Sequence, residues 1–168
     1  MNEIFMERSV AINGTNTNCI SPLMLASYKG KLEIFIYLFE MGVNINILDN
    51  DNNTALHLAA RSFSVDVMKL LVDKVMFVNL TNTNDSIPLH FSAKFGHLDA
   101  TKFLVERSAA IDSTNKYGNT PLSLAEFCGE LEIFHYLTEI SVRSNICDDC
   151  KNSALHLASE RGSVNIIK

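Results

Sequence analysis

The chain has 168 residues, of which 47% are apolar and 20% charged, and it carries a formal net charge of −5. This composition is ordinary for a soluble globular protein and too apolar for a disordered one. The acidic net charge argues against a general nucleic-acid-binding surface, because such surfaces are usually basic. The sequence has no run of about 18 apolar residues, so we expect no insertion into a membrane.

A motif recurs along the chain at a fixed spacing. The segments TALHLA, TPLSLA and SALHLA occupy residues 54–59, 120–125 and 153–158. A column of leucines has members 33 residues apart, and all three prolines directly precede one of them. The column consists of Leu23, Leu56, Leu89, Leu122 and Leu155. A self-similarity of this length indicates an array of structural repeats, and we expect the column leucines, Leu122 included, to be buried between units.

Each unit predicts two short helices followed by a turn. Ser21 and Thr120 precede proline, which favours an N-cap with proline at the first helical position. A glycine near position 30 of the first unit, and its equivalents, ends this helix. A second helix begins near Leu32 and its equivalents, with apolar residues at helical spacing. An Asn-rich stretch such as VNINILDND then predicts a β-turn or hairpin.

These columns resemble the ankyrin repeat family, whose pattern includes T-P-L-H-x-A, and the resemblance covers the whole chain. It implies an all-α ankyrin-repeat solenoid, in which helix–turn–helix units of 33 residues are joined by β-hairpin-like loops whose tips project at right angles. We assign residues 1–168 to one ankyrin repeat domain. It has partial repeats at 1–16 and 149–168 and full repeats at 17–49, 50–82, 83–115 and 116–148.

The ends do not have the polar outer face that terminal repeats normally carry. Ile4 and Phe5 lie near one end, and Ile166 and Ile167 near the other. We therefore expect a fragment of a longer array that can associate end to end through its uncapped terminal repeats.

The sequence offers no convincing catalytic or metal-binding set. It has neither a phosphate-binding glycine loop nor an H-E-x-x-H motif. His57, His90 and His156 fall in one column, and the resemblance implies that this histidine hydrogen-bonds the neighbouring turn. The segment CDDC at 147–150 could be a redox pair or half of a zinc site, although chance occupancy of a loop tip is favoured. We predict no enzyme activity, no cofactor and no metal site.

The four cysteines are too few for a disulfide-built scaffold, and the start MNEIFMERSV is not a secretory signal. A cytoplasmic protein with reduced thiols is the simpler expectation.

Three positions depart from the repeat pattern. Ile87 replaces the Ser or Thr cap, Phe63 replaces the glycine between two helices, and Val75 stands where Gly42 ends the first unit's second helix. Loss of a hydroxyl cap costs roughly 1 kcal/mol, and a β-branched residue disfavours the left-handed conformation that glycine adopts.

The resemblance also implies that partners bind on the concave face, through the loop tips and the exposed side of the first helices. At positions the pattern leaves free lie aromatic and basic residues, types that dominate interface energies. The candidate protein-binding residues are Tyr28, Lys29, Arg61, Lys94, Phe95, Tyr117 and Phe127. An alternative is that Phe95 and Phe127 merely pack across adjacent units. The cations Lys29, Arg61 and Lys94 suggest an acidic component in the partner.

The function predicted from these features is a non-catalytic protein–protein interaction scaffold that binds another protein on its concave face. The alternative is a regulatory or targeting segment of a larger enzyme, channel or toxin.

Overall fold

The computed structural model describes residues 12–74 and 77–144. The described residues form eight helices and no strand. In chain order they are α2 (Pro22–Tyr28), α3 (Leu32–Glu40), α4 (Ala55–Arg61), α5 (Val65–Lys74), α6 (Pro88–Lys94), α7 (Leu98–Glu106), α8 (Pro121–Cys128) and α9 (Leu131–Ser144).

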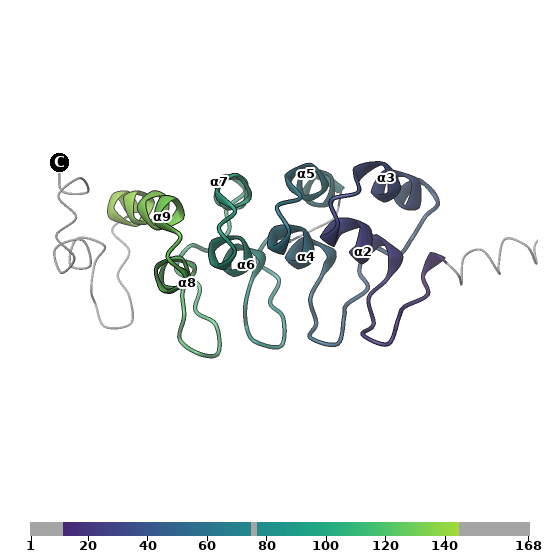
Figure 1. The fold of residues 1–168 in the computed structure, drawn as a ribbon, viewed down its shortest axis with the longest axis horizontal. Helices are drawn as coiled ribbons and strands as arrows, with labels where there is room; N and C mark the ends of the chain where they lie inside the picture. The colour runs from purple at the N-terminus through teal and green to yellow at the C-terminus, as the bar shows by residue number, and fades with distance from the viewer. Residues whose placement is uncertain (1–11, 75–76, 145–168) are drawn as a thin grey trace, which may run out of the picture.

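The helices stand in two rows (Figure 1). The inner row consists of α2, α4, α6 and α8, which pack side by side in chain order. The outer row consists of α3, α5, α7 and α9, each packed on the inner helix that precedes it. The loops between pairs project from the inner row, on the side away from the outer row (Figure 1). This arrangement confirms the predicted all-α solenoid of helix pairs.

The inner helices begin where the sequence predicts. The Ser21 hydroxyl accepts the backbone N–H of Met24 at 3.3 Å, and the Thr120 hydroxyl accepts that of Ser123 at 3.1 Å. Ile87 has no oxygen to offer, so α6 lacks a hydroxyl cap, as predicted. The backbone N–H of Ile87 is satisfied instead by Nδ1 of His90, at 3.2 Å.

The projecting loops repeat one hydrogen-bond pattern. An Asn or Asp side chain accepts the backbone N–H groups two and four residues further on, at 2.8–3.1 Å, in the local turn that such residues favour. These residues are Asn16, Asp49, Asn82 and Asn115. Backbone bonds then join each tip to the next, from Asn50 to Asn18, Thr83 to Asp51 and Lys116 to Asn84, at 2.9–3.2 Å. These bonds therefore hold neighbouring loops in register and connect the units a second time, in addition to the packing of the helices.

The column leucines form the centre of the core. Leu23, Leu56 and Leu89 are fully buried, as expected. The expectation for Leu122 was wrong in degree, because this side chain is half-buried and packs against a smaller cluster around Ala125, Ile133 and Leu137. In the described part of the chain, α8 has a neighbouring inner helix on one side only. Leu155 lies outside the described residues, as do Val75, the CDDC segment and both chain ends.

Phe63 keeps the backbone shape of the glycine it replaces. Its φ is 64°, beside 61° at Gly30, 77° at Gly96 and 77° at Gly129. A side chain in this left-handed region costs roughly 1–2 kcal/mol. The α4–α5 connection therefore follows the same path as the others at the expense of local strain.

Candidate protein-binding surface

Arg61 joins candidate residues from three consecutive units. It ends α4, and its guanidinium carbon lies 5.8 Å from the ring centroid of Tyr28, which ends α2. The same carbon lies 5.2 Å from the ring centroid of Phe95, the residue that follows α6. Both separations fall within the ≈ 6 Å range of a cation–π contact.

Two lysines complete this cluster. Lys29 Nζ lies 5.2 Å from the Tyr28 ring centroid, and Lys94 Nζ lies 5.7 Å from that of Phe95. We call the five residues Tyr28, Lys29, Arg61, Lys94 and Phe95 the aromatic–cation strip. The structure thus brings together five of the seven residues singled out in the sequence, across the C-terminal ends of α2, α4 and α6.

Within the described residues, the other two candidates make no cation–π contact with these five. Tyr117 is in the loop before α8, 68% exposed, with Lys116 Nζ 5.1 Å from its ring centroid. Phe127 is on α8 and is 89% exposed, which is not the burial expected of a residue that packs between units. Phe95 is 39% exposed and covers Arg61.

A groove of about 550 Å³ runs between the inner helices and the loops of the first units. Its helix side contains Leu25, Leu58, Tyr28 and Arg61, and its loop side contains Asn18, Ile20, Asp49, Asn50, Asp51 and Asn53. Sequence reasoning missed Leu25, which is 49% exposed. The available signal was an apolar residue at the variable position of the T-P-L-H-x-A motif. The lining of the groove therefore combines apolar side chains with one cation, Arg61, and two carboxylates, Asp49 and Asp51.

The fold and this surface agree with a comparison against known families. The family described as ankyrin repeats (3 copies) matches residues 3–82 and again residues 75–146. The chain belongs to the ankyrin repeat family. Ankyrin repeats are generally protein–protein interaction modules. No curated protein matches the chain by sequence. Within residues 12–74 and 77–144, no helix of this ankyrin array has the length and apolar character needed to cross a membrane.

The ankyrin column histidines are structural. Nδ1 of His57 accepts the backbone N–H of Thr54 at 3.2 Å, so Nε2 carries the proton and donates to the carbonyl of Ser86 in the next unit, at 3.0 Å. His90 repeats this bond to the carbonyl of Asn119, at 3.1 Å. Burial lowers the pKa of His57 to about 4, although the Ser86 bond opposes the shift. Burial also lowers the pKa of His90. Both rings thus link neighbouring repeats, which confirms the predicted hydrogen bond to the neighbouring turn for His57 and His90. His156 lies outside the described residues.

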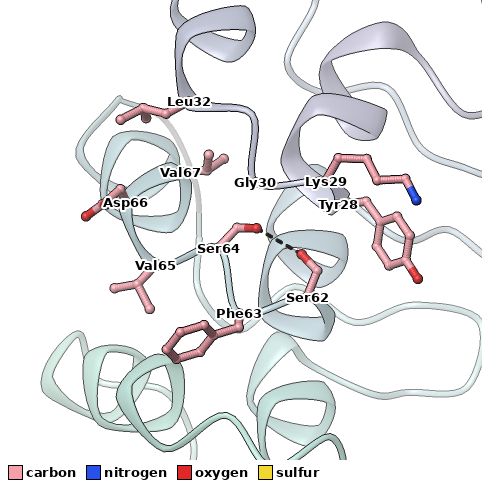
Figure 2. Close-up of a pocket in the computed structure, with 10 residues that line it drawn as sticks. All are labelled: Tyr28, Lys29, Gly30, Leu32, Ser62, Phe63, Ser64, Val65, Asp66 and Val67. Carbon is pink, nitrogen blue, oxygen red and sulfur yellow. Dashed lines mark hydrogen bonds between the residues drawn. The ribbon is translucent and has the colours of Figure 1, made fainter.

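A second hollow, of about 420 Å³, lies where the α2–α3 and α4–α5 connections of the ankyrin array meet (Figure 2). A bond of 2.9 Å between the hydroxyls of Ser62 and Ser64 crosses it. The Phe63 ring points toward the following repeat, where it lies 5.5 Å from the ring centroid of His97. Tyr28 and Lys29 extend in the other direction in Figure 2. Tyr28 and Lys29 are the two residues of the aromatic–cation strip that line this hollow.

Proposed function

We propose that this chain is a non-catalytic protein-binding module that recognises another protein on the inner-row side of the array. The aromatic–cation strip is the centre of the proposed interface, and Tyr117 and Phe127 are its outlying anchors. The observation that carries the proposal is Arg61, whose guanidinium lies over aromatic rings from both neighbouring units.

The fold does not need these side chains where they stand. The core is already filled by the column leucines and their neighbours, while Tyr28 and Phe95 remain 37% and 39% exposed. Arginine and the aromatic residues are the types that most often carry binding energy at protein interfaces. Exposed rings that are held by neighbouring cations offer a partner a preformed contact surface with little entropy left to lose.

The proposal is tested by comparing two variants in the capture of partner proteins from cell extract. Arg61→Ala with Phe95→Ala removes the centre of the strip, and Glu40→Gln with Glu106→Gln changes exposed positions on the outer row. A genuine partner should be weakened by about 1 kcal/mol or more per strip residue and should tolerate the outer-row change.

Unfolding in urea must be measured alongside, so that a loss of binding is not a loss of folding. The proposal fails if a partner's affinity survives the strip change in a folded protein but drops with the outer-row change. Binding would then belong to the outer row.

A further inference from the structure

Among the residues that the structure describes, no carboxylate forms an ion pair with the cations of the aromatic–cation strip. Within residues 12–74 and 77–144, the ion pairs are Lys69–Asp66 and Arg107–Asp73, which involve α5 and the end of α7 in the outer row. The cations of the strip instead lie over aromatic rings. Lys29 and Arg61 lie over Tyr28, and Arg61 and Lys94 lie over Phe95. A ring face engages the charge but takes none of the N–H donors in a conventional hydrogen bond. The donors of the strip therefore remain available to an anion.

The strip is positive within a chain whose net charge is −5. The groove that Tyr28 and Arg61 of the strip help to line also carries Asp49 and Asp51 on its loop side. A phosphate chain of uniform negative charge laid in the groove would face these carboxylates, whereas a protein segment can direct its acids to one side. Leu25 and Leu58, which also line the groove, suit apolar side chains placed between those acids.

The spacing of the strip indicates the shape of such a segment. Arg61 and Lys94 are the last residues of α4 and α6, and Lys29 directly follows the last residue of α2, so each cation comes from a different unit. Packed helices lie about 8–10 Å apart. A polyproline II helix has about 3 residues per turn and rises about 3.1 Å per residue, so every third side chain points the same way at intervals of about 9 Å. A carboxylate at every third residue would then meet one cation in each unit.

We infer that the aromatic–cation strip binds an acidic segment of the partner protein in polyproline II conformation, with a carboxylate at every third residue and the central one paired with Arg61. This inference rests on the proposed function and adds the chemistry of the partner. Arg61 suits the central role, because a guanidinium stacked on rings still presents a planar fork that matches a carboxylate.

The probe is a fluorescein-labelled peptide, acetyl-Glu-Pro-Leu-Glu-Pro-Leu-Glu-amide, titrated by fluorescence anisotropy. An isomer with its three glutamates adjacent, acetyl-Glu-Glu-Glu-Pro-Leu-Pro-Leu-amide, has the same charge and composition. The spaced peptide should bind about fivefold or more tightly than the isomer, and its binding should weaken as salt is added. Arg61→Gln should weaken it about tenfold, because a charge-assisted hydrogen bond is lost.

Arg107→Gln is the matched control. Its guanidinium also lies over a ring, 4.9 Å from the Phe103 centroid, but it is paired with Asp73 at the outer row. This change should leave peptide binding as it is. In two-dimensional ¹⁵N spectra, the shifts caused by the spaced peptide should centre on Arg61 and Lys94.

Equal binding of the two isomers, or unchanged binding by Arg61→Gln, would overturn the inference. Tighter binding of a short oligothymidylate at the same residues would do so too, because the strip would then select phosphate. No binding of either peptide also overturns it, while the capture experiment still decides the proposed function, because it does not require the partner segment to be acidic.

Discussion

At the scale of single residues, the column histidine is both a link between repeats and a point of acid sensitivity. His57 is fully buried and its two ring nitrogens are committed to Thr54 and Ser86. Protonation of Nδ1 would replace an acceptor with a second donor facing the Thr54 N–H. The low pKa of His57, about 4, follows mainly from burial, which the hydrogen bond to Ser86 opposes.

We expect the free energy of unfolding to fall as the pH is lowered from 6.5 toward 4. In that interval the unfolded chain binds a proton at His57 and the folded chain does not, so protons favour unfolding. The loss at His57 is about 3 kcal/mol at ~1.4 kcal/mol per pKa unit, and it levels off below the folded pKa. His90, whose pKa is also lowered by burial, adds to it in the same direction.

Urea unfolding at about pH 7.5 and about pH 4.5 measures this effect. His57→Gln should be less stable than the native chain at the higher pH, since it loses a buried bond worth about 1–3 kcal/mol, yet it should show a smaller difference between the two conditions. His135→Gln, which removes an exposed imidazole, should keep the native difference. If His57→Gln and the native chain lose the same stability on acidification, the buried ring is not the sensor.

At the scale of elements, the α4–α5 connection shows which part of the repeat is fixed by the backbone. The repeat needs a left-handed residue between its two helices, and the chain supplies Phe63 at φ 64° where its other described units have glycine. Packing over His97 offsets part of the strain. The conformation is thus set by the pair of helices, and the side chain is accommodated.

Phe63→Gly should be more stable than Phe63→Ala by about 1 kcal/mol. Both changes remove the ring, but alanine retains the strain of a Cβ in the left-handed region, which glycine does not. Lys69, in the middle of α5, is the control site, and there alanine should be the better residue by about 1 kcal/mol. Midpoints in urea decide the matter. Alanine equal to or better than glycine at position 63 would mean that this connection relaxes to another path.

Sequence reasoning succeeded where a residue type has the same role in each unit that contains it. Proline and its preceding cap, the left-handed glycines and the column histidines are of this kind, because each acts on the backbone within one unit or on its nearest neighbour. It was wrong for the burial of Leu122, since burial depends on what covers a residue from both sides. It found Arg61, Tyr28 and Phe95 separately but not their contacts. Those contacts depend on the directions of side chains in neighbouring units, between residues that are 33 and 34 positions apart in the sequence.

At the scale of the whole molecule, the array is held together mainly by contacts between neighbouring units. Each inner helix packs mainly on the next inner helix and on its own outer partner, and each loop tip bonds to the next. In such arrays stability is approximately additive over units and interfaces.

Deletion of residues 83–115, the third full repeat that we propose, should leave a folded protein. The cut joins Asn82 to Lys116, which are equivalent in register to successive residues of one loop. Circular dichroism should show similar helicity per residue, and unfolding should occur at a lower urea concentration. The variant should also bind the spaced acidic peptide less well, because Lys94 and Phe95 are gone. Deletion of residues 83–98, which breaks the register, should prevent cooperative folding, and equal folding of the two variants would contradict a modular array.

The position of Arg61 between rings of two neighbours also has a mechanical consequence. The curvature of a repeat array is the sum of small rotations between successive units, so small changes in these rotations add up over the length of the array. A rigid segment bound across α2, α4 and α6 would restrict rotation between these units, because any rotation would move the cations relative to the carboxylates that they bind. The Arg61 guanidinium would have the largest part in this restriction, because it contacts a ring in each of the two neighbouring units. Binding at the strip would then make the array stiffer without changing its average shape.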